Sequence, residues 1–122
     1  VLSDQAPADG RKSYWMDFLH QPTPILFGVE QMANEFDLSV VYFTMKKIKR
    51  GQYSVEFQVL TEAPKSLPYG VLTEKHVQLL EESIIEQPCN WLWSHKRWKR
   101  ELPTDLDALK AAQKSKFEDK YR

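Results

Sequence analysis

The sequence predicts one α/β domain, a small mixed sheet flanked by helices, and three patterns lead to that prediction. Residues 38–45 are nearly all apolar or β-branched, as in a strand buried on both faces. Residues 53–60 alternate between apolar and polar side chains, which is typical of a half-exposed strand. Two stretches, 24–36 and 74–87, carry apolar residues at helical spacing. With 122 residues, 42% of them hydrophobic, the chain is long enough for one compact core.

The first elements are expected to form a strand–helix–strand unit. An aromatic-rich run at 13–18 suits a strand. Thr23 is a suitable N-cap and Pro24 suits the first helical position, so a helix is expected at 24–36. Its inward-facing stripe would be Ile25, Val29, Met32 and Phe36. Because this helix joins the first strand to the strand at 38–45, those two strands should run parallel, with a right-handed crossover.

An antiparallel hairpin is expected next. Gly51 lies in the short link between the strands at 38–45 and 53–60. Four cations precede this turn: Lys46, Lys47, Lys49 and Arg50. They fit an ordinary charged turn that protects a sheet edge. They also fit a basic surface that attracts anionic lipid headgroups. The sequence leaves both interpretations open.

Two further helices complete the predicted fold. Thr73 can cap a helix at 74–87, and Pro88 ends it. The inward stripe of this helix would be Val77, Leu80 and Ile84. Residues 104–122 mix acids and bases and predict a solvated, weakly amphipathic helix at the surface. We therefore divide the chain into a main part, 1–102, and a charged C-terminal helix or tail, 103–122.

Composition excludes several classes of function. The 17 basic and 17 acidic residues balance, so no global charge favours nucleic-acid binding. A single cysteine, Cys89, excludes an internal disulfide. The histidines have no metal-ligand spacing, so we expect neither a metal site nor a cofactor. No apolar run approaches the roughly 18 residues of a membrane span. The chain starts at Val1 without a methionine or signal-peptide pattern, which suggests a fragment of a longer protein.

The most biased stretch is residues 91–100, which holds three of the four tryptophans and no acid. On a helix, Trp91, His95 and Trp98 would share one face. On an extended chain, one side would carry Trp91, Trp93, His95, Arg97 and Lys99. In both geometries aromatic and guanidinium groups are neighbours, and that combination suits a phosphorylated amphiphile at a lipid boundary. Two alternatives stay open: tryptophans that pin the segment to the core, and stacking on single-stranded nucleic acid.

One histidine–acid pair has the spacing of a catalytic motif but the wrong geometry. His76 and Glu81 are five residues apart within a predicted helix. Five helical residues turn through about 500°, so the two side chains point roughly 140° apart. A general base and its orienting carboxylate need hydrogen-bond contact. We therefore assign this pair no catalytic role.

The order of motifs resembles the C-terminal part of the late acyltransferases of lipid A biosynthesis, the lauroyl/myristoyl acyltransferase family, over about residues 2–101. The most specific motif is Trp91-Leu92-Trp93-Ser94-His95-Lys96-Arg97-Trp98-Lys99. Weaker support comes from Asp4-Gln5, Pro22-Thr23-Pro24, the hairpin at 49–57 and Glu86-Gln87-Pro88. The resemblance implies part of a glycerolipid-acyltransferase-like fold.

The resemblance also implies an activity: transfer of a fatty acyl chain from acyl carrier protein to a hydroxyl of a phosphorylated lipid A precursor. The family's His-x4-acid motif would lie upstream, so the fragment should be inactive alone, with no catalytic residue of its own. The expected substrate-binding residues are Asp4, Trp91, Trp93, His95, Arg97 and Lys99. Arg97 and Lys99 would hold acceptor phosphates or neighbouring acidic groups, with Trp91 and Trp93 at the interface.

The expected partners and location follow from the same resemblance. The full-length enzyme would work at the cytoplasmic face of the inner membrane, while the fragment itself would be soluble. A homodimer could cover the sheet edge that a truncated strand exposes. Two rival functions remain, a non-catalytic lipid or membrane-surface module and a small nucleic-acid-binding domain.

Overall fold

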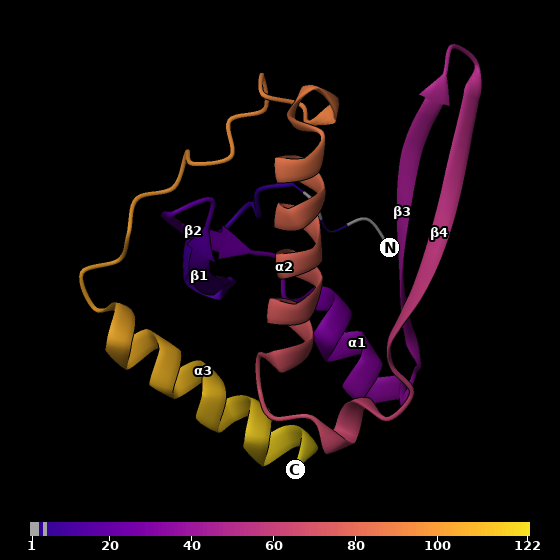
Figure 1. Ribbon diagram of the computed structural model, residues 1–122. Helices are drawn as coiled ribbons and strands as arrows, with labels where there is room; N and C mark the ends of the chain where they lie inside the picture. The colour runs from indigo at the N-terminus through magenta and orange to yellow at the C-terminus, as the bar shows by residue number, and fades with distance from the viewer. Residues whose placement is uncertain (1–2, 4) are drawn as a thin grey trace.

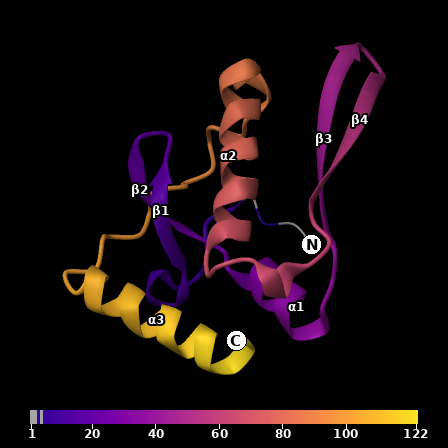
Figure 2. The same cartoon turned by 60° about the horizontal axis from the view of Figure 1, so that its bottom comes forward.

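The computed structural model describes residue 3 and residues 5–122, and it combines helices with two separate sheets (Figures 1 and 2). The elements are β1 Tyr14–Phe18, β2 Gln21–Ile25, α1 Gly28–Phe36, β3 Val40–Lys49, β4 Gln52–Thr61, α2 Val71–Glu86 and α3 Leu106–Tyr121. Helix α2 stands between the short β1–β2 hairpin and the long β3–β4 hairpin, and α3 lies across one end (Figure 1). The predicted α/β class is confirmed.

The strand–helix–strand prediction is wrong at its start, because residues 21–25 form a strand. Strand β2 pairs antiparallel with β1, with Pro24 opposite Trp15. Proline has no backbone N–H to donate to a neighbouring strand, so it suits the edge strand of a two-stranded sheet. Thr23 is therefore not a helix cap, and its Oγ1 donates to the Gln21 carbonyl at 2.8 Å. Both sheets in the described part of the chain are antiparallel, so the expected parallel pairing is absent there.

Helix α1 turns a different face inward from the predicted one. Its buried residues are Glu30, Ala33 and Asn34, whereas Met32 is 42% and Phe36 is 64% exposed. Polar contacts explain the orientation, because the Glu30 carboxylate accepts hydrogen bonds at the start of α2. Its donors are Gly70 N (2.7 Å), Thr73 N (2.9 Å) and Thr73 Oγ1 (2.6 Å). Met32 and Phe36 of the predicted stripe consequently face solvent, whereas Val29 is half-buried and Ile25 is buried in β2.

The start of α2 depends on Glu30 and on one glycine. Thr73 is not the N-cap: the helix begins at Val71, with Gly70 as N-cap at φ +85°. A side chain at Gly70 would collide with the Tyr14 ring as well as adopt an unfavourable φ. Glu30 thus supplies from α1 the acceptor that a capping side chain would normally supply from within the same helix.

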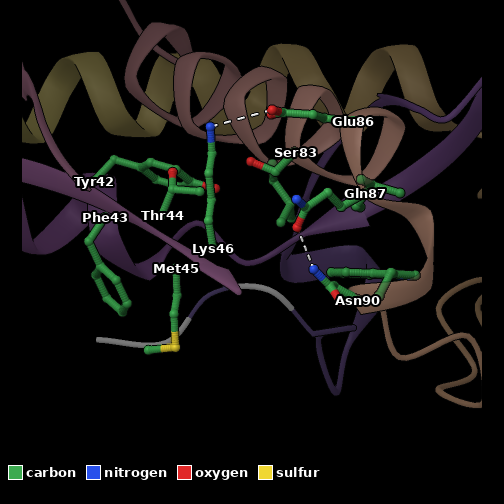
Figure 3. A pocket seen from close by; sticks show the side chains of 12 residues that line it. Tyr42, Phe43, Thr44, Met45, Lys46, Ser83, Glu86, Gln87 and Asn90 are labelled. Atoms are coloured by element: carbon green, nitrogen blue, oxygen red, sulfur yellow. Dashed lines mark hydrogen bonds and ion pairs between the residues drawn. The ribbon is translucent and has the colours of Figure 1, made fainter. Parts of the chain in front are cut away.

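The long hairpin is confirmed as antiparallel, with Gly51 in the turn at φ +76°. The prediction that its first strand is buried on both faces is wrong. Tyr42, Thr44 and Lys46 are half-buried on the side of α2, and Lys46 Nζ lies 3.4 Å from Glu86 Oε1 (Figure 3). Phe43 and Met45 point away from α2 in that view. The more polar face of the hairpin therefore meets the body.

The core lies between α2 and the β1–β2 hairpin. Phe18, Ile25, Val77 and Ile84 are buried there, with Leu80, Trp91 and Trp98 packed against them. This arrangement confirms the predicted inward stripe of α2. Between α2 and β3 a groove of about 220 Å³ remains, lined by residues of both elements such as Thr44, Lys46 and Ser83 (Figure 3).

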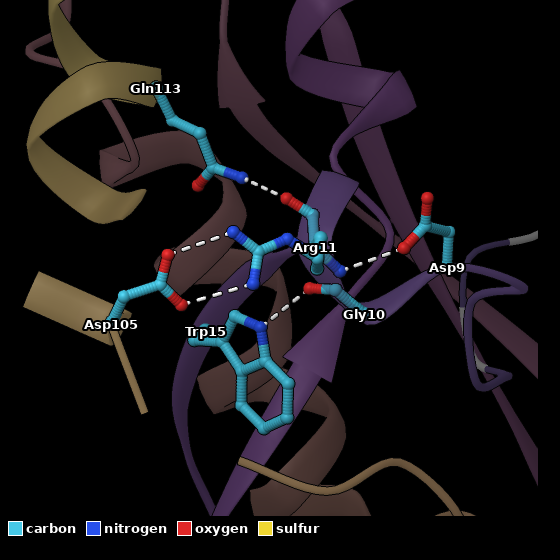
Figure 4. A network of polar contacts seen from close by, with 6 residues as sticks. All are labelled: Asp9, Gly10, Arg11, Trp15, Asp105 and Gln113. Carbon is cyan, nitrogen blue, oxygen red and sulfur yellow. Dashed lines mark hydrogen bonds and ion pairs between the residues drawn. The ribbon is translucent and has the colours of Figure 1, made fainter. Parts of the chain in front are cut away.

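Helix α3 lies on the surface as predicted, but one aromatic side chain anchors it. Phe117 is buried, with ring centroids 5.6 Å from Phe27 and 5.2 Å from Tyr69. At the other end of the helix, the Arg11 guanidinium donates to both carboxylate oxygens of Asp105, at 3.0 and 2.8 Å (Figure 4). The C-terminal segment is thus docked at both ends.

Candidate functional site

Residues 91–100 form a series of turns and are neither a helix nor an extended strand. The indole N–H of Trp98 donates to Thr23 Oγ1 at 2.9 Å, and that of Trp93 donates to the Pro88 carbonyl at 2.6 Å. The Trp91 ring lies edge-on to Phe18, with centroids 6.1 Å apart. Trp91 and Trp98 therefore hold the segment on the core. Tryptophans that pin the segment to the core were one of the alternatives that the composition left open. The Trp93 ring remains 55% exposed.

Arg97 is the largest fully buried side chain of the described residues, at 2% exposure. Its guanidinium carbon lies 5.4 Å above the centroid of the Phe18 ring. An arginine over an aromatic face gains cation–π attraction, which strengthens when the pair is shielded from water. The structure therefore places Arg97 beneath the segment and away from its surface.

Two histidines line the same region. His95 is half-buried, and its Nε2 accepts the Ala6 backbone N–H at 3.1 Å, which places the proton of the neutral ring on Nδ1. Burial lowers the pKa of His76, and the positive charge of Arg97 lowers it further, while a backbone hydrogen bond with Ser3 opposes the shift. Ser3 and Ala6 therefore both reach this region. Asp4, also predicted at the site, lies outside the described residues.

The cations that face solvent form a second layer. Lys96, Lys99 and Arg100 are all exposed, and we call them the basic rim. Exposed ammonium and guanidinium groups attract phosphates, and arginine can bind them with two parallel hydrogen bonds. The six predicted site residues thus divide by depth. Arg97 is buried, Trp91 and His95 are half-buried, Trp93 and Lys99 are exposed, and Asp4 is not described.

His76 and Glu81 do not act as a base and its orienting acid here. Glu81 Oε1 accepts the Leu19 N–H at 3.0 Å, so the carboxylate holds the turn between β1 and β2. Leu19 and His20 both have positive φ in that turn, 50° and 63°, which an outside acceptor helps to stabilise. Sequence reasoning missed this turn and the Phe18 platform under Arg97, because neither leaves a recognisable pattern along the chain.

The half-buried His76 should make stability depend on pH. Because the pKa of His76 is lower in the folded state, the unfolded chain binds the proton more readily. The free energy of unfolding should therefore fall as the pH drops below the ordinary value of 6.5, until the lowered pKa is passed. Urea titrations between pH 7.5 and 5 should show this loss, and His76→Gln should reduce it. His20→Gln, at an exposed position, is the control; an equal effect of both variants would contradict the assignment.

None of the helices in the described part of the chain is long and apolar enough to cross a bilayer. Within residues 3 and 5–122, no three histidine, cysteine or acidic side chains gather as metal ligands would.

Comparison with known proteins identifies the family. No significant match is found among curated proteins or among solved structures. Residues 1–100 match the family described as bacterial lipid A biosynthesis acyltransferase. Among the described residues, that match includes the four strands, α1, α2 and residues 91–100, which we call the basic–aromatic segment, while α3 lies beyond it. The chain therefore belongs to the bacterial lipid A biosynthesis acyltransferase family.

Proposed function

We propose that this chain is the acceptor-binding portion of an enzyme that transfers a fatty acyl chain from acyl carrier protein to a phosphorylated lipid A precursor. The family match supports the reaction class. The basic rim supports a phosphorylated acceptor, because its three exposed cations follow the exposed Trp93 within seven residues of the chain. Tryptophan at a lipid boundary and cations at phosphates together suit a lipid whose headgroup carries phosphate.

In this proposal the buried and exposed layers of the segment have different tasks. Arg97 over Phe18 fixes the path of the backbone. The basic rim then holds the acceptor phosphates, and Trp93 lies at the lipid boundary. His95 ties the segment to Ala6, next to the part of the chain where Asp4 is expected to contribute.

The chemical step needs a general base that these residues do not supply. The base removes the proton of the acceptor hydroxyl, and that oxygen attacks the thioester carbonyl of the donor. The new ester bond forms as the bond to sulfur breaks, and the carrier leaves as its thiol after taking up the proton. We assign the base to a His-x4-acid motif upstream of this sequence, in an enzyme at the cytoplasmic face of the inner membrane.

The test is acyl transfer by the complete gene product, with acyl carrier protein as donor and a phosphorylated lipid A precursor as acceptor. Lys99→Glu should raise the KM for the acceptor by about tenfold, because a contact between a cation and phosphate is lost. Lys110→Glu makes the same charge change on the exposed surface of α3 and should leave the KM unchanged. With an acceptor lacking phosphate, the two variants should behave alike.

Two results would overturn the proposal. If the complete protein transfers no acyl chain but the chain binds phosphorylated lipid vesicles through the basic rim, it is a non-catalytic lipid-binding module. If Lys99→Glu transfers normally to the phosphorylated acceptor, the basic rim is not the phosphate site.

A further inference from the structure

The last two residues of the basic–aromatic segment, Lys99 and Arg100, are both cations of the basic rim. Long exposed side chains keep most of their rotamer freedom, so the position of the backbone decides where each charge can reach. Upstream, Trp98 fixes the segment through the hydrogen bond from its indole N–H to Thr23 Oγ1. The contacts downstream of Arg100 therefore decide how firmly this end of the basic rim is placed.

The downstream contact is an ion pair between Arg11 and Asp105, which follows Arg100 by five residues. The Arg11 guanidinium donates from Nη1 to Oδ1 at 3.0 Å and from Nη2 to Oδ2 at 2.8 Å (Figure 4). Two parallel hydrogen bonds fix the relative orientation of the two planar groups as well as their separation. The pair can therefore hold the chain just after residue 100 in one position.

The backbone around Arg11 is itself held by several hydrogen bonds (Figure 4). The Arg11 N–H donates to Asp9 Oδ1 at 2.9 Å, and its carbonyl accepts from Gln113 Nε2 at 2.8 Å. The preceding carbonyl, of Gly10, accepts the indole N–H of the buried Trp15 at 2.6 Å. Most exposed ion pairs contribute little, since two mobile side chains must first be ordered. Here the backbone on the arginine side is already ordered, which lowers that cost.

Asp105 uses its carboxylate for this pair although it occupies the N-cap position of α3. Aspartate favours that position because its carboxylate can accept an N–H of the first turn. The Asp105 side chain makes no such capping hydrogen bond. Helix α3 is anchored further along by the buried Phe117. The main effect of the ion pair therefore falls on residues 101–105, which link the basic–aromatic segment to α3.

Arg100 lies against the same 3₁₀ turn that carries Arg11, at Gly10–Lys12. A methyl group at Gly10 would lie 3.6 Å from Cβ of Arg100 and 3.3 Å from the nearest atom of the Trp15 ring. The stem of Arg100 thus packs beside Gly10 at van der Waals distance. One turn therefore supports Arg100 directly and holds the link that follows it through the ion pair.

The charges of this region explain why the ion pair matters for an anion. Its acids are Asp9, Glu101 and Asp105. Asp9 Oδ2 lies 3.9 Å from Lys12 Nζ, Asp105 is compensated by Arg11, and Glu101 is exposed. Without Arg11, the Asp105 carboxylate would compete with a phosphate for Arg100, because opposite charges a few ångströms apart attract each other strongly near a protein surface.

We infer that Arg11 and Asp105 are positioning residues for acceptor binding, whose ion pair holds Lys99 and Arg100 where both can reach the acceptor phosphates. This inference rests on the proposed function, because it takes the basic rim as the phosphate site. Neither residue touches the acceptor, and both act through the backbone of residues 99–105. Asp105 lies beyond the family match, which ends at residue 100, so the inference assigns part of acceptor binding to the C-terminal segment.

Acyl transfer by the complete gene product, with the concentration of the phosphorylated acceptor varied, provides the first test. Asp105→Asn should raise the KM for the acceptor about fivefold and leave kcat within about twofold, because the chemical step lies elsewhere. Charge alone predicts the opposite direction, since this substitution removes a negative charge near the phosphates. Glu101→Gln removes the same charge one residue from Arg100, and it is the matched control that should not raise the KM.

A double variant and an exchange measurement separate positioning from other effects. Arg11→Gln should also raise the KM about fivefold, and R11Q/D105N should again raise it about fivefold, whereas independent changes would multiply to about 25-fold. Hydrogen–deuterium exchange of peptides covering residues 99–105 should become faster in these variants but not in Glu101→Gln. Circular dichroism checks that every variant is folded.

The inference and the proposed function fail in different ways. If Lys99→Glu raises the KM but Asp105→Asn changes neither the KM nor the exchange rates, the basic rim stays the phosphate site and the positioning inference is wrong. If Asp105→Asn lowers the KM, the ion pair acts through its charge alone and the inference is wrong as well. If Lys99→Glu leaves the KM unchanged, the proposed phosphate site is lost, and faster exchange in Asp105→Asn would leave the pair a purely structural contact.

Discussion

Replacing Arg97 by alanine is expected to lower the free energy of unfolding by about 3 kcal/mol, because it leaves a cavity beneath the basic–aromatic segment. The side chain is 2% exposed and covers the Phe18 ring, which is itself fully buried. Its loss should loosen the contacts of Trp91 and Trp98 with the core. Urea denaturation followed by tryptophan fluorescence measures the change.

Arg100 supplies the matched control, since it is an exposed arginine in the same segment. Arg100→Ala should change the free energy of unfolding by less than about 0.5 kcal/mol. Arg97→Met, which keeps most of the volume but removes the charge, separates packing from electrostatics. Wild-type stability of Arg97→Ala, together with weaker binding of phosphorylated lipid, would contradict the structural role and restore Arg97 as a direct phosphate ligand.

Replacing Glu30 by alanine is expected to cost about 3 kcal/mol of stability as well. The substitution leaves the buried N–H groups of Gly70 and Thr73 and the Thr73 hydroxyl without their acceptor. These groups start α2, so the loss affects the helix on which the core is built. Thermal and urea unfolding, followed by circular dichroism at 222 nm, should both show the change.

Two other variants make the Glu30 experiment specific. Gln31→Ala alters the next residue of α1, which is exposed, and should be nearly neutral. Burial raises the pKa of Glu30, although hydrogen bonds from Thr73 and Gly70 and the charge of Arg122 act in the opposite direction. An uncharged acceptor should therefore be tolerated in part, and Glu30→Gln should cost about half as much as Glu30→Ala. Equal stability of Glu30→Ala and wild type would show that α2 starts without this acceptor.

The parts of the fold that the sequence determined by itself are those with a strong local period or a turn signal. The apolar stripe of α2 marks the buried side of that helix, and the alternation in β4 marks a strand with one apolar and one polar face. Gly51 marks the hairpin turn because only a residue tolerant of positive φ suits it. The order of motifs likewise led to the acyltransferase family without any structure.

Tertiary structure decided which of two chemically possible faces became buried. Met32 and Phe36 of α1 face outward because the Glu30 carboxylate accepts hydrogen bonds from backbone N–H groups about 40 residues further along the chain. Residues 21–25 became a strand because Trp98 and β1 offer contacts that outweigh the helix-start signal of Thr23 and Pro24. A local pattern gives the period of a segment but not the partner that its face will meet.

The basic–aromatic segment illustrates the same limit most clearly. Its composition indicated that tryptophan and arginine side chains would be neighbours, and Arg97, Trp91 and Trp98 all lie against the Phe18 ring. It did not indicate that Arg97 would be buried while Lys96, Lys99 and Arg100 stayed in solvent. That difference depends on the Phe18 ring, which comes from a strand almost 80 residues earlier in the chain. Burial of a charge is decided by such distant partners, because only they can compensate for the lost water.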